Sequence, residues 1–341
     1  MNNLKNHKIQ TLLVVGLGSI GLKHIKTVKA IRDEIKVIAL TSRPSDHKEN
    51  HLISNIVDNL DDALKLVPDA AIISNPASKH IEFAVPLAKK SIPLLIEKPI
   101  SDSLANVDQL TKVINSTDNF VLVGYNLRFL NSLKFFRDSV QNNEIGKILS
   151  VRASVGQDLK TWRKDRDYRE GVSSKRSLGG GVLLELSHEI DYLSWIFGRI
   201  QSVTGYFNKV SNLEIDVEDI SHLLLKFDDS SQAKDLVANL SLDFLRQDIT
   251  RYCVAIGETG TLRWDGINSK VELFQGGKWN VIFEEKAKVD TSYESELQHF
   301  FDCVENCNEP FVDLECSINV LKVIEGIKLS YNQNTFVDIL K

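Results

Sequence analysis

The stretch 11–21, TLLVVGLGSIG, places an apolar run directly against three closely spaced glycines. Residues 12–15 have the length and β-branched content of a strand covered on both faces, and a helix-like segment, IGLKHIKTVKAI, follows at once. The first N–H groups of a helix are unpaired and its dipole is positive there, so such a turn suits a phosphate. In this pattern Gly16 allows the tight turn, Gly18 leaves room for a pyrophosphate, and Gly21 lets helix and strand pack closely.

We therefore predict that this turn binds a dinucleotide, although the same spacing also occurs in ordinary strand-to-helix turns. The predicted cofactor contacts in the turn are Gly16, Gly18, Ser19, Ile20 and Gly21. The end of the next strand, ALTSRPSD, bears on the choice between NAD and NADP, since an acid there suits NAD and small polar or Arg side chains suit NADP. Ser42 and Arg43 occupy this place, which favours NADP. If Arg43 is only a solvated loop residue, NAD remains open.

Length and composition indicate a soluble globular protein with more than one core. The 341 residues exceed what a single hydrophobic core usually holds, so two domains are expected. There are 41 basic and 46 acidic residues, a net charge of −5 that argues against a general nucleic-acid binder. The first ten residues are polar and no apolar run approaches the roughly 20 residues of a membrane span, so we expect a cytoplasmic location.

The four cysteines are too few and too unevenly placed for a disulfide framework, and we expect them to be reduced. Cys303 and Cys307 stand four apart, but no neighbouring Cys or His completes a tetrahedral set. No metal site is expected.

The order of strand-like and helix-like segments differs between the first and the later part of the chain. The first third alternates strand-like and helix-like segments, which predicts an α/β Rossmann domain with a doubly wound parallel sheet over 1–124. From about residue 148 strands dominate, which predicts an α+β domain over 125–341 with a large, open, mostly antiparallel sheet and a helix at 182–197. One helix-covered face would leave the other face apolar, so we expect a homodimer or homotetramer.

The segment LLIEKPISD ends another strand with Glu97, Lys98 and Pro99. A lysine at the carboxyl end of a parallel strand lies at the ligand-binding edge of the sheet, where an ammonium can polarise a hydroxyl or carbonyl. Pro99 restricts the backbone of Lys98 and so helps to aim it. The alternative is a surface lysine in an ordinary turn.

The segment LGGGVLLELSHEIDYLSWIFG carries the second candidate, His188. On a helix it shares a face with Asp191 and Tyr192, beside the apolar stripe, so it is semi-buried next to polar groups. A histidine titrates near neutrality, which suits the proton transfer that accompanies hydride transfer, and Asp191 can orient the imidazole. The alternative is a core-packing histidine.

Taken together, these stretches resemble the Gfo/Idh/MocA (glucose-fructose oxidoreductase, inositol dehydrogenase, rhizopine catabolism) family of NAD(P)-dependent sugar and polyol oxidoreductases. The matching elements, in family order over nearly the whole chain, are VVGLGSIGLKH, ISNPASKH, IEKP, VGYNLRF, EIGKILSV, GGGVLLELSHEIDYLSWIFG and YESELQHFFDCV. The resemblance implies that Lys98 and His188 are catalytic, in a cleft that both domains share. It implies further cofactor contacts at Asn75, Pro76, His80, Glu97 and Lys98. Many members carry an aspartate where this chain has Leu184, and Glu185 is one residue out of register.

A basic, aromatic segment, GQDLKTWRKDRDYREGVSSKRSLGGG, is too irregular for a core element, and long loops at an active-site edge usually bind something. Trp162 can stack on a sugar ring, and its cations can engage a phosphate or carboxylate, so the substrate is expected to be anionic; a solvated loop is the alternative. The cations are Arg163, Arg166, Arg169 and Lys175. The predicted substrate contacts are Asn126, Arg128, Trp162, Arg163, Glu185 and Asp191.

The leading hypothesis is an enzyme that moves a hydride between nicotinamide and a sugar carbon, with a nucleotide-linked sugar or sugar acid as substrate. His188 serves as acid and base and Lys98 as polariser, with Glu185 and Tyr192 as the next proton carriers to consider. An imine or enone reductase on the same scaffold and a non-catalytic NADP-binding sensor remain as alternatives.

Overall fold

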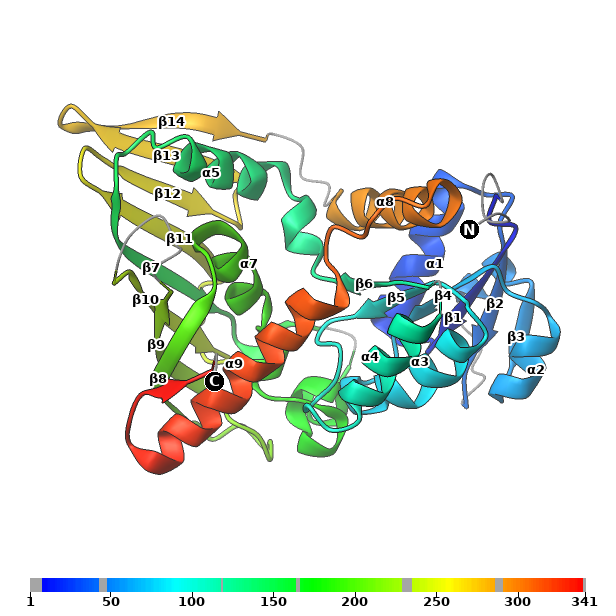
Figure 1. Ribbon diagram of the computed structural model, residues 1–341. Coiled ribbons are helices and arrows are strands. Elements are labelled where there is room, and N and C mark those ends of the chain that lie inside the picture. The colour runs from blue at the N-terminus through cyan, green and yellow to red at the C-terminus, as the bar shows by residue number, and fades with distance from the viewer. Residues whose placement is uncertain are drawn as a thin grey trace. The chain divides into compact units, whose positions relative to one another are not determined.

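The computed structural model describes residues 8–42, 48–117, 119–163, 166–228, 235–285 and 291–339, so Arg43 lies outside the described residues. The chain forms two compact units (Figure 1). The first comprises Met1–Asn126 and Thr291–Ile318, and the second comprises Leu127–Asp290 and Asn319–Lys341. The sequence predicts a domain boundary near residue 124. In the structure the segment 291–318, which follows that boundary, also belongs to the first unit.

The first unit is built on a parallel sheet, as predicted, and this sheet has six strands in the order β3-β2-β1-β4-β5-β6. Its strands are β1 (Thr11–Val15), β2 (Lys36–Leu40), β3 (Asn55–Val57), β4 (Ala70–Ile73), β5 (Leu94–Glu97) and β6 (Val121–Gly124). The strand order reverses between β1 and β4, where Val15 pairs with Ile73. Ligands of such sheets bind at this reversal, outside the carboxyl ends of the strands.

Connections between neighbouring parallel strands are right-handed as a rule. The connections of this sheet run outward from the reversal in opposite directions, so the helix after β1 and the helix after β4 lie on opposite faces of the sheet. The helices are α1 (Ser19–Ile31), α2 (Leu60–Lys65), α3 (His80–Lys89), α4 (Val107–Ser116) and α8 (Ser292–Asn306). Figure 1 shows α8, in orange, beside α1, in blue. Arg32 after α1 forms an ion pair with Glu305 in α8, and Glu305 also accepts the N–H of Ile9 at 3.0 Å. These contacts anchor the returning segment.

The second unit contains a nine-stranded sheet with the order β14-β13-β12-β11-β7-β10-β9-β8-β15. β7 and β10 are parallel and the other neighbours are antiparallel, which confirms the predicted mostly antiparallel sheet. The strands are β7 (Ile148–Gly156), β8 (Ile200–Asn208), β9 (Ile220–Phe227), β10 (Val237–Asp243), β11 (Thr250–Gly257), β12 (Thr261–Asp265), β13 (Lys270–Gln275), β14 (Lys278–Glu284) and β15 (Val337–Asp338). The helices are α5 (Asn131–Gln141), α6 (Val182–Glu185), α7 (His188–Phe197) and α9 (Leu314–Gln333), whose first residues belong to the first unit.

The outward-facing side of the large sheet is of mixed polarity, whereas an apolar face was expected. Along β9 buried residues alternate with less buried ones, and the outward side chains include His222, Leu224 and Lys226. In β10 the outward side chains include Asn239 and Ser241. The period-2 alternation of these strands therefore combines polar and apolar groups on one face.

The predicted continuous helix over 182–197 is wrong. It is broken into α6 and α7, because Leu186 leaves the helical region at φ −102°, ψ 25°. The break makes His188 the first residue of α7.

Candidate functional site

The glycine turn between β1 and α1 has the geometry that a bound pyrophosphate requires. Gly16 has φ 95°, a conformation that favours glycine, and its N–H donates to Leu40 O at 2.9 Å. A Cβ on Gly21 would lie 2.0 Å from Gly16 O, so no side chain fits there. A Cβ on Gly18 would meet no atom within 4 Å, so open space adjoins this backbone.

Two buried polar atoms fit a dinucleotide at this turn. Ser19 Oγ, in the first turn of α1, and Asn75 Oδ1, after β4, have no hydrogen-bond partner within the part of the chain that the structure describes. Buried polar atoms are normally hydrogen-bonded, and a ligand satisfies them as well as protein does. Ser74 Oγ fixes the intervening backbone by donating to Val15 O at 3.0 Å and Gly16 O at 3.1 Å. Ser19, Asn75 and the three glycines are therefore suited to hold NAD(P).

His80 joins the loops after β4 and β5. Its Nε2 lies 2.7 Å from Asn75 O and its Nδ1 lies 3.0 Å from Pro99 O, and the residue is buried. Burial lowers the pKa of His80, while the hydrogen bonds to the two carbonyl oxygens act in the opposite direction. The side chain therefore fixes the backbone on both sides of the predicted cofactor site, while Pro76 forms the intervening turn.

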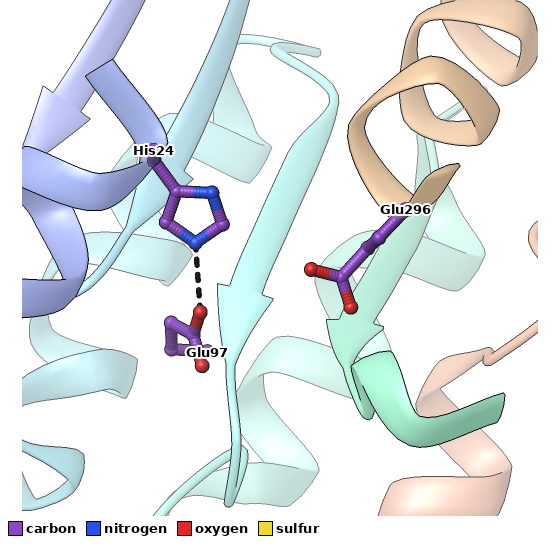
Figure 2. A group of neighbouring side chains, drawn as sticks. All are labelled: His24, Glu97 and Glu296. Atoms are coloured by element: carbon purple, nitrogen blue, oxygen red, sulfur yellow. Dashed lines mark hydrogen bonds and ion pairs between the residues drawn. The ribbon is translucent and has the colours of Figure 1, made fainter. Parts of the chain in front are cut away.

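Glu97 ends β5 with its carboxylate turned toward the protein interior, where it lies 2.7 Å from His24 Nε2 (Figure 2). Its other oxygen accepts the backbone N–H of Lys98 at 3.2 Å. Lys98 follows directly, half-buried, with a cis peptide bond to Pro99.

Asn126, also in the first unit, donates to Ser292 Oγ at 2.8 Å. Ser42, which is exposed, follows β2.

In the second unit Asp191 pairs with Arg128 rather than standing free to orient His188. Arg128 donates to both carboxylate oxygens, and the ring of Trp195 lies 5.5 Å from the guanidinium carbon. Burial raises the pKa of Asp191, and the charge and hydrogen bonds of Arg128 oppose that effect. His188 is 9% exposed at the start of α7.

The end of α6 carries another carboxylate that the sequence singled out. Glu185 is the last residue of α6 and accepts a hydrogen bond from Ser173 Oγ at 2.9 Å. Tyr192, one turn into α7, is fully buried against Trp264, and burial raises its pKa well above the usual range. Tyr192 is therefore a poor proton carrier, because its phenol does not ionise near neutral pH.

Glu218 is a polar residue of this region that sequence reasoning missed. Its carboxylate accepts the N–H of Leu183 at 3.2 Å, and a Cβ on Gly181 would lie within 2.3 Å of it. Burial raises the pKa of Glu218. Gly181, just before α6, thus leaves room for this carboxyl group, and in the sequence only the glycine itself indicates that requirement.

In the basic loop Trp162 packs within the unit, with its ring 5.0 Å from that of Phe244 and its Nε1–H donating to Gln157 O. Arg169 pairs with Asp167 and Glu214 at the surface. Lys175 and Arg169 border an open surface hollow that Lys209 and Asp216 also line. Arg163 is half-buried and Arg166 is exposed.

The structure thus brings together the glycine turn, Asn75 and His80 in the first unit, and Arg128 and Asp191 in the second. Lys98 lies in the first unit and His188 in the second. Among the residues described, none of the helices has the length and apolar character needed to cross a membrane.

Comparison with known proteins connects both parts of the chain to one group. Residues 11–125 match the family model GFO_IDH_MocA, described as "Oxidoreductase family, NAD-binding Rossmann fold". Residues 137–339 match GFO_IDH_MocA_C, described as "Oxidoreductase family, C-terminal alpha/beta domain".

Myo-inositol 2-dehydrogenase of Thermotoga maritima is 26% identical over 191 residues, an alignment that spans 54% of this chain and only about half (54%) of that relative. Scyllo-inositol 2-dehydrogenase (NAD(+)) of Bacillus subtilis is 25% identical over 74% of this chain and 72% of its own length. The solved WlbA dehydrogenase from Bordetella pertussis, in complex with NADH and UDP-GlcNAcA, shares the fold with a TM-score of 0.82 at 18% identity, covering 98% of this chain and 99% of that chain.

Proposed function

Because the chain belongs to the Gfo/Idh/MocA family of oxidoreductases, as its motifs predict, we propose that it is an NAD(P)-dependent dehydrogenase acting on a hydroxyl-bearing carbon of a sugar. The observation that carries this proposal is the glycine turn. Open space adjoins Gly18, and the buried Ser19 Oγ and Asn75 Oδ1 have no hydrogen-bond partner among the described residues at the reversal of the sheet. When bound there, the nicotinamide supplies or accepts the hydride.

Lys98 and His188 are the residues we assign to the chemistry. Lys98 follows β5, two strands from β1, at the carboxyl edge where the cofactor binds. Its ammonium stabilises the developing alkoxide of the substrate. His188 takes the hydroxyl proton, because a neutral imidazole is the side chain best matched to proton transfer near pH 7. In this proposal both side chains act on the same substrate carbon.

The substrate we propose is an anionic sugar, such as a nucleotide-linked sugar or a sugar acid. The cationic loop with Arg163 supports an anion, and Trp162 offers an aromatic surface beside it. The complex of WlbA with UDP-GlcNAcA supports the same class by analogy. On the sugar side we place Asn126, Arg128, Glu185 and Asp191. Because the carboxylate of Asp191 is occupied, its part is to orient Arg128.

We also propose that Ser42 and Arg43 favour NADP over NAD, and that the chain assembles as a homodimer or homotetramer through the large sheet. The first rests on the absence of an acid at the end of β2, whose last residue is Leu40. The second rests on the exposed Leu224, Tyr206 and Trp279 of that sheet, which leave apolar area open to solvent.

The test is steady-state turnover of NAD(P) with a panel of neutral, acidic and nucleotide-linked sugars. His188→Asn and Lys98→Ala should each lower kcat by about 10² to 10⁴ and leave the cofactor Kd nearly unchanged. His51→Asn and Lys90→Ala, at exposed positions, serve as matched controls. Near-parental turnover in His188→Asn would exclude it as the proton carrier. Cofactor binding without turnover on any sugar would favour a sensor.

A further inference from the structure

We propose that Glu218 is a positioning residue, whose side chain fixes the start of α6 and thereby the place of His188 at the start of α7. This role rests on the proposed function, because it matters for turnover only if His188 acts on substrate. The contacts that support it lie within the second unit, and they join the segments 172–173, 180–189 and residue 218.

Glu218 binds the first residues of α6 twice. It stands two positions before β9, and α6 lies beside β9 and β10. The backbone carbonyl of Glu218 accepts the N–H of Val182 at 3.2 Å, and its Oε1 accepts the N–H of Leu183 at 3.2 Å. Both N–H groups belong to the first turn of a helix, where the helix itself offers them no carbonyl. Because Val182 and Leu183 are buried, water is a poor substitute for Glu218 as their acceptor.

Two glycines allow this close approach. Gly181 has φ 103°, a conformation that favours glycine, and a Cβ there would collide with Glu218 Oε1. A Cβ on Gly180 would collide with Val172 O, and the N–H of Gly181 donates to Ser173 O at 3.2 Å. The chain that leads into α6 is therefore in close contact with both 172–173 and Glu218, and a side chain at either glycine would push it away.

The restraint at the start of α6 continues to His188 through a short series of hydrogen bonds. The N–H of Leu186 donates to Val182 O at 3.0 Å, and the N–H of Glu189 donates to Leu186 O at 3.3 Å. α6 has only four residues, so the distance along the chain from Glu218's contacts to His188 is small. A shift at the start of α6 therefore moves the start of α7 as well.

The other side-chain anchors of α7 lie after His188 in the sequence. Arg251 on β11 donates to Glu189 Oε1 at 2.8 Å, and Arg128 donates to both oxygens of Asp191. These ion pairs hold the body of α7. They do not determine where the chain enters it, so the position of His188 depends on how α6 is held.

This role requires the reach of the Glu218 side chain rather than its charge. Burial raises the pKa of Glu218, while the hydrogen bond from Leu183 and the charges of Lys328 and Arg176 act in the opposite direction. A carboxyl group retains an acceptor oxygen in either protonation state, so the contact with α6 does not depend on ionisation. Two substitutions separate reach from charge. Glutamine keeps the length and an acceptor oxygen, whereas aspartate keeps the charge and is one methylene shorter.

The first experiment measures turnover of both variants in the full chain, with a sugar that the panel identifies as substrate. Glu218→Gln should keep kcat within about twofold of the parent. Glu218→Asp should lower kcat about tenfold or more, with the KM and the cofactor Kd within about twofold. Glu214→Asp, at an exposed position of the same segment, is the matched control and should leave kcat unchanged. A loss of kcat in Glu218→Gln, parental kcat in Glu218→Asp, or a change confined to KM would overturn the proposal.

The second experiment observes His188 directly and needs no substrate. In nuclear magnetic resonance spectra of protein with ¹⁵N-labelled histidine, the imidazole signals of His188 are those that His188→Asn removes. Glu218→Asp should shift or broaden these signals, and Glu218→Gln should leave them in place. The signals of His51, in the first unit, should stay unchanged in both variants, which shows that the chain remains folded.

Unmoved His188 signals in Glu218→Asp would overturn the positioning role. Parental turnover in His188→Asn would instead overturn the proposed function, and the spectra would still decide whether Glu218 fixes the position of His188.

Discussion

Arg128 and Asp191 form a bidentate ion pair inside the second unit, with Arg128 Nε 2.9 Å from Oδ2 and Nη2 2.7 Å from Oδ1 of the aspartate. The residues are 5% and 1% exposed. Each therefore depends on the other as its counter-charge, because water cannot solvate either group. The motif YNLRF supplies the arginine and the helix after the triple glycine supplies the acid, 63 residues apart.

Asp191→Asn should leave Arg128 buried without a counter-charge and lower the free energy of unfolding by about 3–5 kcal/mol, measured by urea denaturation. Asp248→Asn provides the matched control, since Asp248 pairs with Arg246 at the surface. That change should leave the free energy of unfolding nearly unchanged. Similar costs for the two variants would contradict a buried pair.

Gly18 and Gly21 should respond to alanine in different ways. Gly21→Ala places a methyl group 2.0 Å from a backbone oxygen, so it should lower the free energy of unfolding by about 3 kcal/mol or more. Gly18→Ala meets no atom within 4 Å and has an ordinary φ of −72°, so the free protein should lose no more than about 0.5 kcal/mol. Its NADH and NADPH affinities should nevertheless fall at least about tenfold, because the methyl group occupies the space of the pyrophosphate. Calorimetric titration measures this, and unchanged affinity would place the dinucleotide elsewhere.

The ion pair of Arg32 with Glu305 should make the anchoring of α8 depend on pH. Burial opposes ionisation of Glu305, but the hydrogen bonds from Arg32 and Ile9 outweigh it and lower its pKa. A lowered pKa in the folded state adds stability above the unfolded value of about 4.3, and this stability is lost as the pH falls through the folded value. Glu305→Gln should therefore cost about 1–3 kcal/mol at pH 7 and progressively less below about pH 4. A cost that stays constant with pH would show that the charge of Glu305 is not involved.

Arg43→Ala should remove most of any preference for NADPH over NADH, because a guanidinium binds the 2′-phosphate and an alanine does not. Dissociation constants for both cofactors, measured by nicotinamide fluorescence, test this. Lys48→Ala, nearby on the chain, is the control for a general loss of positive charge. Equal affinities for the two cofactors in the parent protein would contradict the assignment of Ser42 and Arg43.

Light scattering should give the mass of a dimer or tetramer at micromolar protein concentration. Introducing a charge on the outward face of the large sheet, as in Leu224→Glu, should dissociate the assembly, since buried like-charged or unpaired groups are costly at an interface. Asn239→Asp, on the same face but already polar, should have a weaker effect. A monomer mass for the parent would remove the sheet from consideration as an interface.

The sequence by itself determined the features that depend on local geometry. Apolar runs such as 12–15 specify buried parallel strands through their composition. The glycine spacing specifies the turn because a side chain on Gly16 or Gly21 would clash with nearby atoms, whereas Gly18 adjoins open space. Lys98 is placed at the carboxyl edge for the same reason, since it follows a buried strand directly.

Only the tertiary structure decided which charged groups meet, because ion pairing joins residues with no local relation. Asp191 is one turn from His188 on the same helix, yet its carboxylate belongs to Arg128. From the motif alone, Glu97 beside Lys98 is predicted to contact the cofactor. In the structure the carboxylate of Glu97 instead lies against His24, 73 positions away, and near Glu296, 199 positions away. The break between α6 and α7 and the return of α8 to the first unit have the same origin. Burial of side chains against distant segments outweighs the helical periodicity that a local reading of 182–197 detects.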